Sequence, residues 1–299
     1  MSKLCAYSKY ILSEFGGWVC PEQPARLVRR FVSGIHEKRE HQKTLSILQL
    51  NDRFKNLHKG KKCFVLGNGP SNNLLDLALL SGEITIACNH FYKFSMTTNW
   101  SPTYYCTGDP FITWSAIGGK GLDLLHLYWN SIVDNTDCNA YFSHISCKDP
   151  LFGAPPSVHA NMYYWSPQET IDETSRVVGK KIDFSTGTHT PIWLTPMLSV
   201  NLAIYMGCNP IYLVGCDTNY LTEFLKGNDY VSHFYHEDDV ERESQQKPMS
   251  QIIYETSVAI KGFEQLSSYA TYHSINILDL TPNGFLRCFP KGVYSNVLT

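Results

Sequence analysis

The chain has 299 residues, of which 43% are hydrophobic and 17% are charged, a composition typical of globular proteins that excludes a disordered or fibrous chain. Its 25 Lys and Arg residues nearly balance its 27 Asp and Glu residues, and a formal charge of -2 excludes the positive field typical of a nucleic-acid-binding protein. Any anionic ligand must therefore be held by local groups.

Ten cysteines are scattered along the chain without a CxxC spacing. Several lie in apolar runs, where a free thiol behaves as a small hydrophobic group, so we interpret them as reduced core residues of a cytoplasmic protein. The first twenty residues contain no long apolar stretch or cleavage signature, and no later segment approaches the roughly 20 apolar residues of a membrane span. We expect neither secretion nor membrane integration.

Residues 1–57 are predicted to form an N-terminal helical appendage. Their segment "ARLVRRFVSGIHEKREHQKTL" is basic and roughly amphipathic. It favours either a solvated helix packed on the main domain or a peripheral contact with a membrane, at its inner face, or with a partner. Both interpretations stay open.

Residues 58–299 alternate between strand and helix patterns and are predicted to form one domain. The predicted strands are residues 61–67, 83–89, 103–109, 211–217 and 275–281, each a short apolar run bounded by turn residues. Predicted helices cover residues 71–82, 195–206 and 248–273, whereas residues 110–185 are poorly patterned. This alternation predicts an α/β fold, Rossmann-like, with a mostly parallel sheet and helices on both faces.

The helix at 195–206 has the clearest boundaries. Thr195 is predicted as its N-cap, Pro196 as its first residue and Gly207 as its stop. After the strand that follows, the polar, tyrosine-rich stretch of about 218–247 is predicted to be an inserted lid, at the strand ends where open α/β sheets bind ligands.

The first strand ends in the turn Gly67-Asn68-Gly69-Pro70-Ser71. Small residues let the backbone pass close to a ligand and direct free amides at a phosphate, but ordinary turn chemistry explains the same composition. The turn is neither GxGxxG nor a P-loop. Asn68 favours a ligand, because an amide offers both donors and an acceptor.

The next two strands also end in polar residues, Asn89 and Asp109. Together with the turn at Gly67 they would converge on one edge of a parallel sheet, which suggests a site. The hydroxyl-rich stretch "DFSTGTHTPIWLTP" precedes the helix that begins near Thr195, and either binds an anion or caps the helix. Asp217 either holds a ligand or satisfies loop amides.

The stretch "SHFYHEDD" contains His233 and His236. Two histidines three residues apart lack a third metal ligand at a recognisable spacing, so a general base is the better functional interpretation. The neighbouring acidic residues would favour a charged imidazole unless they point away. A surface histidine without a role is the alternative.

The motifs "GNGPS", "CNHFY", "IYLVGCDTNY", "HFYH" and "INILDLTPNGFL" occur in an order that resembles the bacterial sialyltransferases of glycosyltransferase family 42, over about residues 58–288. The opening "GKKCFVLGNGPS" is also similar to bacterial proteins related to the 6-hydroxymethylpterin diphosphokinase-like domain. The first resemblance implies a single Rossmann-like domain with a lid, a GT-A-like variant, that uses a CMP-activated acid sugar with no metal and no other cofactor.

The resemblance also implies roles for individual residues. His236, which matches the family's base better than His233, would deprotonate the acceptor hydroxyl, and Asp217 is the acid after the fourth strand pattern. Residues implied at the nucleotide and donor are Gly67, Asn68, Gly69, Ser71, Asn89, Asp109, Thr195, Tyr220 and Tyr230. Asp109 departs from the family's asparagine, and a carboxylate beside an acidic donor is unfavourable unless paired.

Three functions remain open at this point. The first is metal-independent, inverting transfer of sialic acid or a related ulosonic acid from a CMP donor to a cell-surface glycan, without nucleic acid as a partner. The second is diphosphate transfer from ATP to a pterin-type alcohol, which needs Mg²⁺ and carboxylates such as Asp109 and Asp217. The third is a non-catalytic nucleotide-binding module. The sequence leaves a homo-oligomer open.

Overall fold

The computed structural model describes residues 41–108, 121–148, 161–167, 180–187, 194–219, 222, 233–236 and 248–298. Contacts within the chain separate two units, Met1–Ile47 and Leu48–Thr299. Residues 41–47 are the described part of the first unit, and they are helical. No helix in the described ranges combines the length and the apolar character needed to cross a membrane.

The second unit begins ahead of the expected boundary at residue 57. Leu48 is buried, and the 3-10 helix η1 (Gln49–Phe54) packs into the sheet unit. Within η1, the buried Asn51 donates from Nδ2 to the backbone oxygens of Tyr164 (2.7 Å) and Phe184 (2.8 Å). These residues therefore belong to the core of the sheet unit and not to an appendage.

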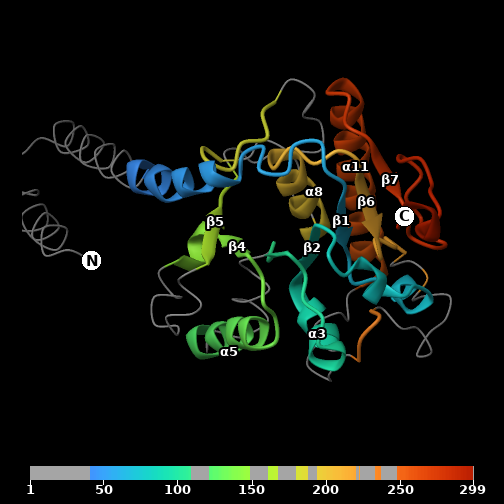
Figure 1. The fold of residues 1–299 in the computed structure, drawn as a ribbon, viewed down its shortest axis with the longest axis horizontal. Helices are drawn as coiled ribbons and strands as arrows, with labels where there is room; N and C mark the ends of the chain where they lie inside the picture. Colours follow the sequence, from blue (N-terminus) through green and yellow to red (C-terminus); the bar gives the residue numbers. More distant parts are fainter. Residues whose placement is uncertain are drawn as a thin grey trace, which may run out of the picture. The chain divides into compact units, whose positions relative to one another are not determined.

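The described residues of this unit form a seven-stranded, fully parallel sheet (Figure 1). Its strands are β1 (Cys63–Leu66), β2 (Thr85–Cys88), β3 (Tyr104–Cys106), β4 (Ala140–His144), β5 (Met162–Trp165), β6 (Ile211–Val214) and β7 (Ile277–Asp279). The spatial order is β5-β4-β3-β2-β1-β6-β7. Strands β1, β2 and β3 are buried along their whole length, as parallel strands covered on both faces are.

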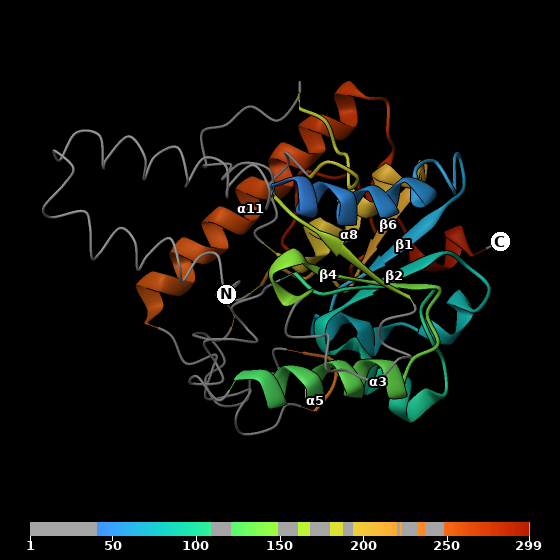
Figure 2. The ribbon, with the colours of Figure 1, turned by 90° about the vertical axis from the view of Figure 1, so that its left-hand side faces the viewer.

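Helices cover both faces of the sheet, which confirms the predicted α/β class (Figure 2). The described α-helices of the sheet unit are α3 (Tyr92–Thr98), α5 (Gly121–Asp134), α8 (Thr195–Tyr205) and α11 (Met249–Tyr272). The further 3-10 helices are η2 (Pro70–Leu74), η3 (Leu77–Leu80), η4 (Asn89–Phe91), η5 (Ile145–Cys147) and η7 (Tyr294–Val297). Helix α8 packs on β1, β2 and β3, and α11 packs on α8. On the opposite face, Trp129 of α5 meets Tyr141 of β4 edge to face.

Two parts of the sheet unit differ from the sequence prediction. The stretch 71–82 forms η2 and η3 in place of one helix, because Leu75 is extended and the Asp76 side chain caps Ala78 N at the start of η3. The poorly patterned stretch 110–185 supplies α5, β4 and β5. Strands β4 and β5 are rich in aromatic residues and largely buried on both faces, so they show no alternation of polar and apolar residues.

Helix α8 begins one position earlier than predicted. Leu194, extended at φ -129° and ψ 148°, occupies the N-cap position without a side-chain cap, and Thr195 is the first helical residue. The Thr195 hydroxyl is therefore not used as a cap. Gly207 follows the helix with φ +77°, a conformation that glycine adopts without strain.

The strand order reverses direction between β1 and β6. Strands β2 to β5 extend from one side of β1, whereas β6 and β7 extend from the other side. Such a topological switch point opens a crevice at the carboxyl ends of the two strands, where α/β proteins bind ligands. The loops after β1 and β6 form the candidate site.

Candidate functional site

The glycine turn after β1 lies directly against the loop after β6. Gly67 N donates to Val214 O (2.8 Å), and Gly69 N donates to Gly215 O (2.9 Å). A Cβ atom on Gly67 would lie 2.4 Å from Gly215 O, and one on Gly69 would lie 1.8 Å from Asp217 Oδ2. Both glycines are therefore required for the close approach of the two loops.

Asp217 holds the turn from the β6 side. Its carboxylate accepts a hydrogen bond from Ser71 Oγ at Oδ2 (2.7 Å) and one from Ser71 N at Oδ1 (3.3 Å), and the residue is 6% exposed. Burial raises the pKa of Asp217, although the two bonds from Ser71 oppose the shift. Asp217 therefore accepts hydrogen bonds from the glycine turn, which favours a structural role over direct contact with a ligand.

Asn68 and Asn72 extend the turn toward its neighbours. Asn72 Nδ2 donates to Gly67 O (2.8 Å), which closes the turn, and Asn68 Nδ2 donates to Cys88 O at the end of β2 (3.1 Å). Asn68 Oδ1 is buried and finds no donor among the described residues. An unpaired buried acceptor costs about 1–3 kcal/mol, so this oxygen can still accept a hydrogen bond.

The ends of β2 and β3 meet the start of α8. Asn89 adopts a left-handed backbone conformation (φ +51°), which asparagine tolerates better than most residues. Its side-chain Oδ1 accepts from Thr195 Oγ1 (3.2 Å), and its carbonyl accepts from Tyr105 OH (2.6 Å). A Cβ atom on Gly108 would lie 2.4 Å from Thr195 Oγ1. The positive end of the α8 dipole thus lies beside Asn89.

The described segment 233–236 contacts the glycine turn. Phe234 N donates to Asn68 O (3.2 Å). The Phe234 ring packs against Phe91 and Phe94, with centroid separations of 5.3 Å and 5.6 Å. These contacts place the segment, with the exposed His236, beside the turn after β1, although the two are more than 150 residues apart in the sequence.

The two candidate histidines have different surroundings. The His233 ring stacks on Tyr235, with a centroid separation of 5.0 Å and an interplanar angle of 10°, and Lys93 Nζ lies 4.8 Å from the centroid of the same tyrosine ring. His236 is exposed and lines a pocket. His236 is therefore the histidine that a substrate can reach more readily.

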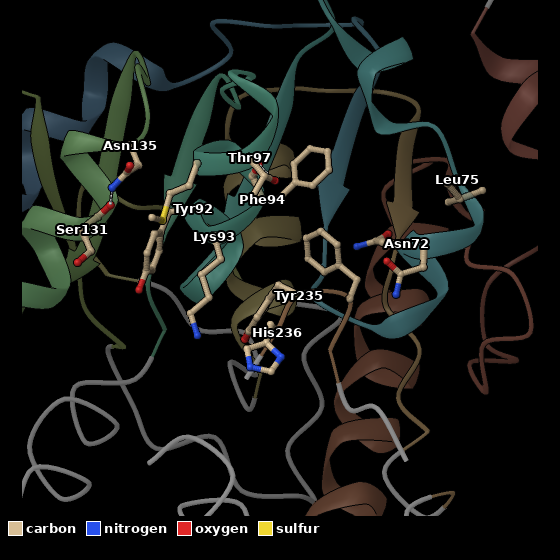
Figure 3. A pocket seen from close by; sticks show the side chains of 13 residues that line it. Asn72, Leu75, Tyr92, Lys93, Phe94, Thr97, Ser131, Asn135, Tyr235 and His236 are labelled. Atoms are coloured by element: carbon tan, nitrogen blue, oxygen red, sulfur yellow. Dashed lines mark hydrogen bonds between the residues drawn. The ribbon is translucent and has the colours of Figure 1, made fainter. Parts of the chain in front are cut away.

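That pocket has a volume of about 770 Å³ and lies between η2, α3, α5 and the 233–236 segment (Figure 3). Its lining residues are Asn72, Asn73, Leu75, Tyr92, Lys93, Phe94, Met96, Thr97, Ser131, Asn135, Phe234, Tyr235 and His236. The lining thus combines aromatic rings with amide and hydroxyl groups.

Several predicted site residues lie outside the described ranges. These are Asp109, Tyr220 and Tyr230, together with most of the predicted lid. Ser185, from the hydroxyl-rich stretch, is described, and its Oγ donates to Asp183 Oδ1 (2.6 Å), so this hydroxyl is used within its own loop. Within the described ranges, no group of three or more His, Cys, Asp or Glu side chains could hold a metal ion.

The structure adds residues to the site that sequence inspection did not select. Asn72 braces the turn, Tyr105 holds Asn89, and the rings of Phe91 and Phe94 receive Phe234. The only signal for Asn72 was its place directly after the glycine turn. Tyr105 and the two phenylalanines were indistinguishable from ordinary core residues, because their partners are remote in the sequence.

No protein-family model and no curated relative matches the chain. Among solved structures, the chain is similar to the sialyltransferase CstII from Campylobacter jejuni in complex with a substrate analogue, CMP-3FNeuAc, with 15% identity and a TM-score of 0.42, over 77% of this chain and 85% of that one. It is also similar to the MAf glycosyltransferase from Magnetospirillum magneticum AMB-1, with 12% identity and a TM-score of 0.46, over 85% of this chain and 38% of that one. Similarities this distant assign no function to the chain.

Proposed function

We propose that this chain is an inverting glycosyltransferase that moves an acidic sugar from a CMP-activated donor to a hydroxyl group of a cell-surface glycan, without a metal ion. The observation that carries the proposal is the hydrogen bond from Phe234 N to Asn68 O (3.2 Å). It joins the segment of His236 to the glycine turn at the topological switch point. A nucleotide-binding turn and a general base acting at the same place are what group transfer to a hydroxyl requires.

The donor would occupy the crevice between the turn and α8. The N-terminus of α8, beside Asn89, suits the phosphate because helix dipoles stabilise negative charge there. Asn68 Oδ1, which is buried and has no partner among the described residues, suits an N–H or O–H donor such as the cytosine amino group or a ribose hydroxyl. Tyr220 and Tyr230 would hold the leaving phosphate.

In the reaction, His236 would remove the proton of the acceptor hydroxyl. At the same time, the hydroxyl oxygen would attack the anomeric carbon of the donor. The bond between that carbon and the phosphate oxygen breaks with inversion, and CMP leaves with one more negative charge than its phosphate carried in the donor. The dipole of α8 and the loop amides would stabilise this charge. The proton stays on His236 until it passes to solvent.

Nucleotide choice tests the donor. A thermal-shift panel of CMP, CDP and ATP, each with and without Mg²⁺, should show that CMP raises the melting temperature by several degrees in the absence of metal. Stabilisation by ATP with Mg²⁺ alone would overturn the proposal and favour diphosphate transfer.

Replacement of the base tests the chemistry. His236→Ala should lower turnover about a hundredfold or more, the usual contribution of a general base, while CMP binding persists. His273→Ala, which alters an exposed histidine after the end of α11, serves as the matched control. Unchanged turnover in His236→Ala would remove this residue from the mechanism.

A further inference from the structure

We propose that the pocket between η2, α3, α5 and the 233–236 segment is the acceptor subsite, and that it receives the terminal saccharide of the glycan. This inference rests on the proposed function, since it names the binding place of the second substrate. We call the pocket, with the lining given above, the acceptor pocket.

The acceptor pocket adjoins the glycine turn, which borders the proposed donor crevice. Asn72 lines the pocket and donates from Nδ2 to Gly67 O (2.8 Å). Phe234 also lines it and donates from its backbone to Asn68 O (3.2 Å). A general base must lie within hydrogen-bond reach of the hydroxyl that it deprotonates, and His236 borders this space. An acceptor in the pocket would therefore present its hydroxyl between the base and the donor.

The lining suits a sugar, because it combines apolar rings with polar groups. Sugars have C–H faces that pack on aromatic rings and hydroxyl groups that both donate and accept hydrogen bonds, and the pocket offers both kinds of partner. Figure 3 shows Tyr92, Thr97, Ser131, Asn135 and Tyr235 around the pocket. The aromatic rings come from α3 and the 233–236 segment, whereas Ser131 of α5 supplies a hydroxyl and Asn135, directly after α5, supplies an amide.

Tyr235, which lines the acceptor pocket, is held in position by two neighbouring side chains. His233 stacks on its ring in a nearly parallel orientation, at a centroid separation of 5.0 Å. Lys93 Nζ lies 4.8 Å from the ring centroid, within the range of a cation–π contact. A ring held by these two contacts loses little conformational entropy on binding a ligand.

A matched pair of threonines on α3 tests the pocket by kinetics. Thr97 and Thr98 are both exposed and both donate from Oγ1 to Phe94 O at 2.9 Å, but only Thr97 lines the pocket. Thr97→Val should raise the KM for the acceptor about tenfold, as the loss of one hydrogen bond does, whereas Thr98→Val should not change it. Equal KM values for the two variants would overturn the inference.

A second pair, at the end of α5 and directly after it, gives an independent kinetic test. Asn135 lines the pocket, whereas the adjacent Asp134 is exposed and does not. Asn135→Ala should raise the acceptor KM about tenfold while the dissociation constant of CMP stays the same. A weaker binding of CMP in Asn135→Ala, with no change in the acceptor KM, would place this residue at the donor and contradict the inference.

Direct binding separates this inference from the proposed function. With methyl-labelled methionine in the full chain, millimolar lactose or sialyllactose should shift the NMR signal of Met96, which lines the pocket and is 59% exposed. Met249, 54% exposed on α11 and absent from the lining, is the control. No shift of Met96 by either sugar, or equal shifts of both methionines, would overturn the inference. Failure of CMP to bind, with Met96 still responding, would overturn only the proposed donor.

Discussion

Gly69 shows how a single residue permits the site. Its backbone is ordinary, with φ -66° and ψ 154°, so the need for glycine is steric and not conformational. The nearest atoms to an added Cβ are Asp217 Oδ2 at 1.8 Å, Asp217 Cγ at 2.5 Å and Gly215 O at 2.8 Å. A methyl group there must displace the carboxylate that holds Ser71.

We therefore expect Gly69→Ala to abolish the stabilisation by CMP and to lower the free energy of unfolding by about 1–3 kcal/mol, the cost of overpacking. Urea unfolding with and without CMP measures both effects. Gly82→Ala is the control, because a Cβ on Gly82 would meet nothing within 4 Å and its φ of +86° leaves only backbone strain. Retained CMP binding in Gly69→Ala would contradict the proposed turn.

At the scale of elements, the 233–236 segment depends on aromatic packing and one backbone hydrogen bond for its position. The Phe234 ring lies against Phe91 and Phe94, and these two also contact Trp100. This cluster forms where η4 continues into α3, next to Asn89. This apolar cluster therefore holds two parts of the proposed site together. One is the end of β2, which would contact the donor, and the other is the segment that carries the candidate base.

Phe234→Ala should remove the packing of the 233–236 segment on Phe91 and Phe94. We expect the rate of transfer to fall more than tenfold, because His236 would lose its orientation, while CMP binding changes little. Phe234→Leu retains an apolar side chain and should recover most of the rate. Steady-state kinetics with CMP titration in parallel measures both quantities, and equal rates for the alanine variant and the unaltered chain would contradict the role of the cluster.

At the scale of the whole sheet unit, residues 183–185 tie the segment before α8 to η1. Asp183 is 2% exposed, and its carboxylate lies 2.7 Å from Lys181 Nζ and 3.5 Å from Lys55 Nζ. Burial alone would raise the pKa of Asp183, but Lys181, Ser185 and Lys55 outweigh it and lower the pKa to about 2. The next residue, Phe184, accepts from Asn51 in η1.

This lowered pKa predicts a pH dependence of stability. The stabilisation by ionised Asp183 is fully present above its unfolded pKa of about 4 and is lost as the pH falls through the folded value of about 2. Because both lysines are partly exposed, we expect about 1–2 kcal/mol. In urea unfolding, the difference between the unaltered chain and Asp183→Asn should shrink between about pH 5 and pH 3. A constant difference would contradict this account.

The sequence was informative where local chemistry decides structure. Apolar runs bounded by turn residues predicted β1, β2, β3 and β6, and Gly207 marked the end of α8. The sequence failed at β4 and β5, because strands buried on both faces lack alternation. It also could not identify Leu194 as the N-cap of α8, because this position is set by backbone geometry without a side-chain cap.

By itself, the sequence determined the α/β class and the glycine turn, since both depend on residues close together in the chain. Only the tertiary structure decided what that turn contacts. Ser71 and Asp217 are 146 residues apart, and Asn89 and Thr195 are 106 residues apart, yet each pair is hydrogen-bonded. The order of the strands brings these residues together at the switch point, and strand order follows from the packing of the whole sheet, which no local pattern encodes.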